Sequence, residues 1–87
     1  MTTINQSLAR VSHVPRVRCG QSVHLRRGKL LGTVSQVHPD RFSVELADGR
    51  EVWLRANSVA ASGVDRVMLV FEAYRLGRYV VEAPAAH

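Results

Sequence analysis

Apolar and polar residues alternate along much of the chain with a two-residue period, which is typical of a β-strand with one buried face. The alternation is clearest at residues 22–25 and 42–46. No segment keeps the 3.6-residue period of an amphipathic helix, and turn residues separate the apolar segments at short intervals. We therefore predict an all-β domain, a small and strongly bent β-barrel of five to six short strands. The strands are expected at residues 22–25, 29–38, 42–46, 51–55, 64–71 and 78–82.

The two ends of the chain differ in composition from this central part. Residues 1–15 are rich in Thr, Asn, Gln and Ser, and we expect a flexible or loosely docked arm there. Residues 16–82 are the expected β-barrel domain, and residues 83–87 the C-terminal tail. A chain of 87 residues suits one domain.

Glycines are expected to interrupt or end several elements. Gly32 lies inside the second expected strand, where a glycine usually marks a bulge or a tight bend. Residues 56–63 are expected to be a connection between strands. Residues 72–76 are expected to form one helical turn that Gly77 stops.

The hydrophobic pattern selects the register of the central hairpin. A two-residue Asp48-Gly49 turn would place the small apolar residues of the returning strand on the polar face of its partner. A three-residue loop at 47–49 instead pairs Val44 with Val52 and brings these residues onto one face. Because register follows the buried face, we predict the three-residue loop with its glycine in the left-handed conformation. Residues 26–28 have the same form, two residues followed by glycine.

This register places Trp53 on the outer face of the sheet, with Arg41 and Arg55 beside it. If the ring is exposed, this group has the composition of a protein-interface hot spot. The alternative is that Trp53 packs beneath an arm or at the barrel edge, because Trp is mostly buried in folded proteins.

The strand expected at residues 64–71 is apolar on both faces. Val67, Leu69 and Phe71 share one face, and Met68 and Val70 lie on the other. The second face is either covered by a terminal segment or used for self-association, because an open apolar patch is unusual on a monomer.

Positive charge is concentrated in the N-terminal part of the chain. The net charge is +5, and no acidic residue precedes Asp40. Such a patch can attract nucleic acid, anionic lipid or an acidic protein face. The alternative is a genomic bias, because eleven of the twelve basic residues are arginine. The candidate residues for binding nucleic acid are Arg16, Arg18, Arg26, Arg27 and Lys29.

Signals for chemistry are absent from the sequence. There is no Gly-x-Ser-x-Gly motif and no complete phosphate-binding loop, so no catalytic residue is assigned. The four histidines lie far apart without ligand spacing, so we expect no metal and no cofactor. Cys19 is the only cysteine, and we expect it to be a small buried side chain. No stretch reaches the length of a membrane span, and we expect a cytoplasmic protein.

Several short motifs resemble PRC-barrel domains. The run from Arg18 to Val23 resembles the G-x-x-V strand that opens this family, and the run from Gly28 to Val34 resembles its G-x-x-(L/I)-G-x-V hairpin. The resemblance extends over residues 17–71, although Ala56-Asn57-Ser58 stands where many members have a proline. It implies a strongly bent barrel that docks onto other macromolecules. Members include the photosynthetic reaction-centre H subunit, a ribosome small-subunit maturation factor and many stand-alone bacterial proteins, and the family has no catalytic residues to carry over.

Two hypotheses follow from the sequence. The leading one is a non-enzymatic adaptor that docks onto a protein or self-associates through Trp53, Arg41, Arg55, Met68 and Val70. The second is an RNA-binding module that uses the basic N-terminal half. No small-molecule substrate is implied by either hypothesis.

Overall fold

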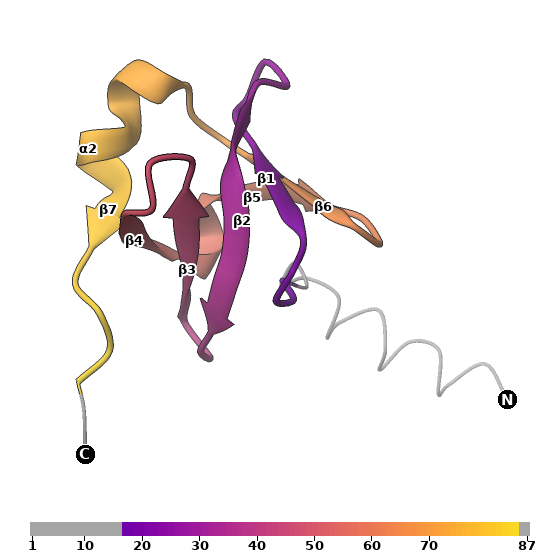
Figure 1. Ribbon diagram of the computed structural model, residues 1–87. Helices are drawn as coiled ribbons and strands as arrows, with labels where there is room; N and C mark the ends of the chain where they lie inside the picture. The colour runs from indigo at the N-terminus through magenta and orange to yellow at the C-terminus, as the bar shows by residue number, and fades with distance from the viewer. Residues whose placement is uncertain (1–16, 86–87) are drawn as a thin grey trace, which may run out of the picture.

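The computed structural model describes residues 17–85, which form one seven-stranded sheet curled into a half-barrel (Figure 1). The prediction of an all-β, strongly bent fold is confirmed. The strand order is β5-β6-β1-β2-β3-β4-β7, and all neighbouring strands are antiparallel except β1 and β6. The strands are β1 (Ser22–His24), β2 (Leu30–Val37), β3 (Arg41–Leu46), β4 (Glu51–Arg55), β5 (Val59–Ser62), β6 (Arg66–Leu69) and β7 (Val80–Val81).

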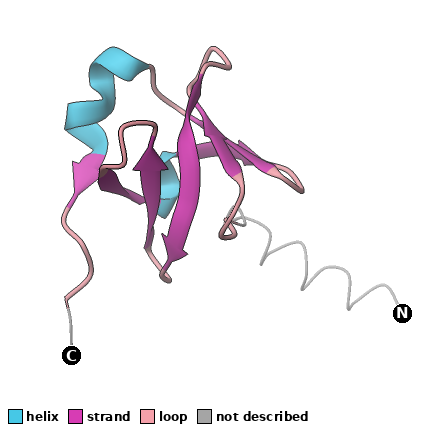
Figure 2. Cartoon of the chain, in the orientation of Figure 1, coloured by secondary structure: helices cyan, strands magenta, loops and turns pink. Residues whose placement is uncertain are grey.

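Three short helical segments complete the described chain (Figure 2). The 3₁₀ turn η1 (Ala56–Ser58) joins β4 to β5, and the 3₁₀ turn η2 (Ala73–Arg75) continues directly into the short helix α2 (Leu76–Tyr79). In residues 17–85 the structure shows no helix of the length and apolarity that crossing a membrane requires.

The inner face of the curled sheet carries the hydrophobic core. Alternate residues of β1, β3 and β6 point inward, as the two-residue period predicts. Leu76 of α2 and Tyr79 pack against the same core from one end. The buried apolar residues are Val23, Leu25, Val34, Phe42, Val44, Leu54, Val59, Val67, Leu69 and Phe71.

Strand β2 bends because it carries two extra residues relative to its neighbours. Val23 and His24 face Gly32 and Leu30, so Leu31 is the extra residue opposite β1. Ser35 is the extra residue opposite β3. Such bulges increase the local twist and allow a small sheet to curl. The expected irregularity near Gly32 is therefore confirmed.

The two hairpin turns predicted from the glycine pattern have the same geometry. In each, the residue before the loop and the residue after it share a backbone hydrogen bond of 2.7 Å, and the loop ends on a glycine with positive φ. The loops are 26–28, with Gly28 at φ 95°, and 47–49, with Gly49 at φ 90°. The predicted three-residue register is confirmed, since Val44 lies opposite Val52.

Two details of the predicted elements are wrong. The expected connection at 56–63 contains the strand β5, whose residues Ala60, Ala61 and Ser62 show no alternation in sequence. Gly77 does not stop the helical turn, because it lies inside α2. The packing of Leu76 and Tyr79 against the core holds the helix through this glycine.

Candidate functional site

Two segments far apart in the sequence meet at one end of the half-barrel. The β1–β2 turn and the helical segment at residues 73–79 both project from the upper end of the molecule in Figure 1. A backbone hydrogen bond of 2.9 Å joins them, from the N–H of Arg26 to the carbonyl of Phe71. The basic turn is thereby held beside the helical segment.

The turn is fixed from below by His24. Its Nδ1 lies 3.0 Å from the carbonyl oxygen of Gly28, which only accepts, so Nδ1 carries the proton. Its Nε2 lies 3.0 Å from the Ser22 hydroxyl. The backbone of the turn is therefore supported, while the side chains of Arg26, Arg27 and Lys29 remain exposed.

Aromatic and ionic contacts hold the helical segment in place. The rings of Phe71 and Tyr79 stack with centroids 4.2 Å apart and an interplanar angle of 16°. Arg27 Nε lies 3.1 Å from a carboxylate oxygen of Glu72. Because the Arg27 side chain is 83% exposed, this ion pair adds little stability, but it offsets the charge of Glu72.

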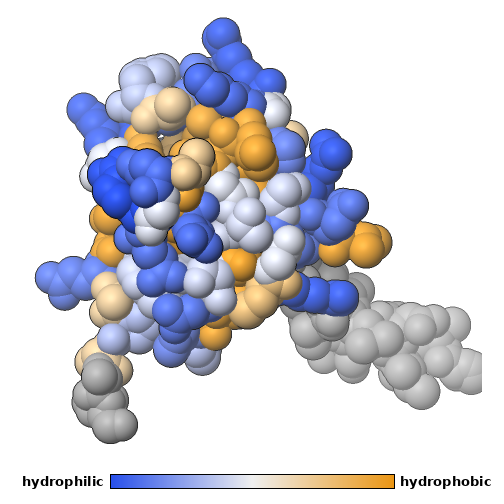
Figure 3. All heavy atoms as spheres, viewed as in Figure 1, coloured by the Kyte–Doolittle hydropathy of each residue, from blue (hydrophilic) through white to orange (hydrophobic). Residues whose placement is uncertain are grey.

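A cavity of about 260 Å³ opens between the turn and the helical segment. Arg26 from the turn and Tyr74, Arg75 and Tyr79 from the helical segment line it, together with Val70, Phe71 and Glu72. We call the residues Arg26, Arg27, Lys29, Tyr74 and Arg75 the tip surface. On the face seen in Figure 3, hydrophilic side chains gather at this end of the molecule, above an apolar patch.

The cations of the tip surface are not all neutralised. Within residues 17–85, neither Arg26 nor Arg75 forms an ion pair. The guanidinium of Arg75 lies 5.6 Å from the ring centroid of Tyr74, and this neighbour raises the pKa of Arg75 above its ordinary value. Both arginines are therefore positively charged and available to an anionic ligand.

Tyr74 and Arg75 are not among the binding residues predicted from the sequence. In the sequence they belong to a short cluster of two tyrosines and two arginines, Tyr74, Arg75, Arg78 and Tyr79. Local patterns predict only a helical turn at residues 72–76 and a strand at residues 78–82, and neither marks a binding surface.

Trp53 lies on the predicted face, but it is only half-exposed. It sits opposite Ser43 of β3 and Val81 of β7, and its ring contacts His38 edge-on with centroids 5.3 Å apart. Ser43 is fully buried and donates a hydrogen bond of 3.1 Å to Glu51. The hydroxyls of Ser35 and Ser43 hold the pKa of Glu51 below its ordinary value.

Arg41 is occupied by contacts within the chain. Its guanidinium donates two hydrogen bonds of 3.1 Å to the carboxylate of Asp40 and one of 2.7 Å to the carbonyl of Glu82. The hydrogen bond from Arg41 lowers the pKa of Asp40. The Arg41 side chain thus connects the start of β3 to the segment that follows β7. Arg55 lies opposite Arg41 and is exposed.

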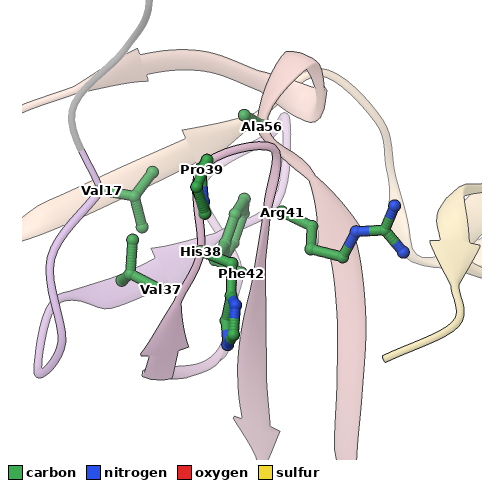
Figure 4. A pocket seen from close by; sticks show the side chains of 7 residues that line it. All are labelled: Val17, Val37, His38, Pro39, Arg41, Phe42 and Ala56. Atoms are coloured by element: carbon green, nitrogen blue, oxygen red, sulfur yellow. The ribbon is translucent and has the colours of Figure 1, made fainter. Parts of the chain in front are cut away.

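A second, smaller cavity of about 170 Å³ lies beside the first residues of β3, Arg41 and Phe42 (Figure 4). Its walls include Val17, Val37, Pro39 and Phe42. In Figure 4 the Arg41 side chain runs away from Val17 and Val37 toward the C-terminal segment. His38 and Arg41 complete the lining together with Ala56, and Arg41 is already hydrogen-bonded to Asp40 and to the carbonyl of Glu82.

The outer residues of β6 and the segment after it are not covered by the C-terminal segment. Met68 is half-buried and Val70 is 37% exposed. Strand β7 pairs with β4, at the opposite side of the sheet from β6. The arm predicted at residues 1–15 lies outside the described residues. Val70 instead lines the cavity at the tip surface.

The four basic candidates that lie within residues 17–85 do not form one surface. Arg18 is exposed but lies in the segment that precedes β1, whereas Arg26, Arg27 and Lys29 follow β1. Arg16 lies outside the described residues. The prediction that Cys19 is buried is wrong, because it occupies an exposed turn and its thiol lies 3.4 Å from the carbonyl of Ser35.

Within residues 17–85, no group of three or more His, Cys, Asp or Glu side chains is placed to hold a metal ion. Comparison with protein-family models, with curated proteins and with solved structures finds no match to this chain. The resemblance to PRC-barrel domains therefore stays a prediction from the sequence.

Proposed function

We propose that this domain binds nucleic acid, RNA in the first place, through the tip surface, and catalyses no reaction. One observation carries the proposal. Arg26 and Arg75, which are far apart in sequence, line the same cavity as the exposed ring of Tyr74. Cations contact phosphates and an exposed aromatic ring stacks on bases, so this combination suits a nucleic-acid chain.

Arg26 and Arg75 are suited to binding phosphate, and contacts within the chain support the backbone that carries Arg26. A guanidinium donates paired hydrogen bonds to phosphate oxygens, and each neutralised phosphate releases counterions into solution. The His24 contact with Gly28 and the bond from Arg26 to Phe71 limit the movement of the turn. Less conformational entropy is then lost when a ligand binds.

The predicted Trp53 surface is a weaker candidate for binding. Arg41 is already held by Asp40 and by the carbonyl of Glu82, and the Trp53 ring packs on His38. A partner at this surface would have to displace these contacts.

RNA binding also agrees with two predictions made from the sequence. One member of the PRC-barrel family acts in ribosome maturation, and a protein with a single cysteine is suited to the cytoplasm.

A fluorescence-anisotropy titration of labelled RNA at several salt concentrations tests the proposal. We expect the affinity to fall steeply as salt rises, because binding releases counterions. The double variant Arg26→Ala/Lys29→Ala should reduce the slope of log K against log salt by roughly 1.4, since each lost phosphate contact on a single strand lowers it by about 0.7.

The matched control is Arg66→Ala. Arg66 is an exposed arginine at the start of β6, beside Ser22 and at the far end from the tip surface. It should leave the salt slope unchanged, and so should Arg18→Ala. Undetectable binding at low salt, or equal effects of the tip and control variants, would refute the proposal.

Protein docking remains a second candidate, because one observation favours it. Leu30, the first residue of β2, is 60% exposed, and Val70, which directly follows β6, is 37% exposed. An adaptor that uses these residues would show no salt-dependent affinity for RNA, so the same titration separates the two candidates.

A further inference from the structure

Among the Phe, Trp and Tyr residues within the described residues 17–85, Tyr74 is the one that is exposed to solvent. Its exposed fraction is 78%, whereas Phe42 and Phe71 are buried at 1% and 2%. Trp53 and Tyr79 are partly buried, and each contacts another ring, Trp53 edge-on with His38 and Tyr79 stacked on Phe71. The exposed ring of Tyr74 contributes little to the core, and its face is accessible to a ligand.

The surroundings of Tyr74 fix the ring beside positive charge. The neighbouring Arg75 lies 5.6 Å from the ring centroid, which is within the range of a cation–π contact. The stacked pair of Phe71 and Tyr79 anchors the segment that carries both residues. The ring and the guanidinium are therefore presented together.

The size of the adjoining cavity limits what it can accept. Pockets for drug-sized ligands measure about 300–1,000 Å³, and this one measures about 260 Å³. It suits one planar group and leaves the rest of a polymer outside. Its walls combine the rings of Tyr74 and Tyr79 with the side chains of Arg26 and Arg75.

The charge at the cavity favours an anion. Glu72 is the one acidic residue in its lining, and Arg27 lies 3.1 Å from the Glu72 carboxylate. The charges of Arg26 and Arg75 then remain for a ligand. Phosphates that flank a planar base match this arrangement, because each nucleotide carries one of each group.

We infer that the cavity beside Tyr74 is a base-stacking subsite for single-stranded nucleic acid, in which one base stacks on Tyr74 and the flanking phosphates bind Arg26 and Arg75. The inference rests on the proposed function and goes further, because it names the strandedness of the ligand. A base in a duplex is stacked on its neighbours on both faces, so Tyr74 cannot reach it without unstacking the helix.

The test compares a labelled single-stranded oligonucleotide with the duplex of the same sequence, using wild-type protein, Tyr74→Ala and Tyr74→Phe. We expect Tyr74→Ala to weaken single-strand binding about 5- to 150-fold, as removal of a stacking platform does. Tyr74→Phe keeps the stacking surface and should bind within about 2-fold of wild type. The salt slope should stay the same in both variants, because no cation is lost.

Three outcomes overturn the inference. In the first, Tyr74→Ala binds the single strand with wild-type affinity. In the second, the wild-type protein binds the duplex as tightly as the single strand. In the third, poly-glutamate of equal charge displaces the labelled oligonucleotide as readily as unlabelled oligonucleotide does. If Tyr74→Ala binds normally while Arg26→Ala/Lys29→Ala does not, the subsite is wrong and the proposed function stands. If no oligonucleotide binds at low salt, both are wrong. Thermal melts of the variants test whether unfolding causes a loss of binding. We expect unchanged melting temperatures, because the Tyr74 ring is exposed.

Discussion

Glycines shape this fold in two different ways. At Gly28 and Gly49 the backbone adopts positive φ, which other residues adopt only with strain. At Gly32 the constraint is space, because a Cβ there would collide with the carbonyl oxygen of Glu45 on the neighbouring strand. The close approach of β3 to β2 therefore depends on this position.

We expect Gly32→Ala to destabilise the domain by about 1–3 kcal/mol, because backbone atoms of β3 have to move away. The matched variant is Gly77→Ala, which meets no atom within 4 Å and lies in a helix. It should stabilise the domain by about 0.5–1 kcal/mol, because alanine restricts the unfolded chain and favours the helix. Urea unfolding of the two variants measures both changes. Equal stability of the two variants would show that β3 does not depend on Gly32.

At the scale of elements, Arg41 connects the hairpin to the end of the chain. Strand β7 has only two residues, and it pairs with Trp53 and Leu54 of β4. The hydrogen bond from Arg41 to the carbonyl of Glu82 adds a side-chain contact to this short pairing. A two-residue strand alone holds a chain end weakly.

Arg41→Ala should therefore loosen the C-terminal segment while leaving the tip surface intact. We expect faster amide hydrogen exchange at residues 80–82 and unchanged exchange at residues 26–29. Arg55→Ala is the control, because Arg55 lies opposite Arg41 and is exposed. Unchanged exchange at residues 80–82 in Arg41→Ala would mean that β7 is held by its backbone pairing alone.

Local patterns predicted some elements and failed for others for identifiable reasons. The register of Val44 and Val52 follows from alternation and one glycine, both of which are local signals. Strand β5 follows no such signal, because Ala60 and Ala61 are small and exposed. Its strand geometry comes from pairing with β6, and the parallel pairing of β6 with β1 is a long-range contact as well.

At the scale of the whole molecule, the candidate site is formed by the curl of the sheet. The cations of the β1–β2 turn were predicted from their spacing in the sequence. Their neighbours Tyr74 and Arg75 reach them only because β6 lies beside β1 and the chain leaving β6 passes Arg26. That contact depends on tertiary structure, so the aromatic half of the site could not be placed from the sequence.

Strand β1 separates basic residues that are close in sequence. Arg18 precedes β1 and Arg26 follows it, so they lie toward opposite ends of this strand. A basic stretch in sequence thus becomes two sites in space, and only one of them has an aromatic neighbour and a cavity.

The most direct test of a nucleic-acid site at the tip surface is an NMR titration of ¹⁵N-labelled protein with a short single-stranded RNA. The amide shifts should change at residues 26–29 and 72–79 and stay constant at residues 17–20 and 62–66. The Trp53 indole signal should also stay constant, because its ring lies against His38 away from the tip. Changes centred on Trp53 or on residues 17–20, or no change at low salt, would contradict the proposed site.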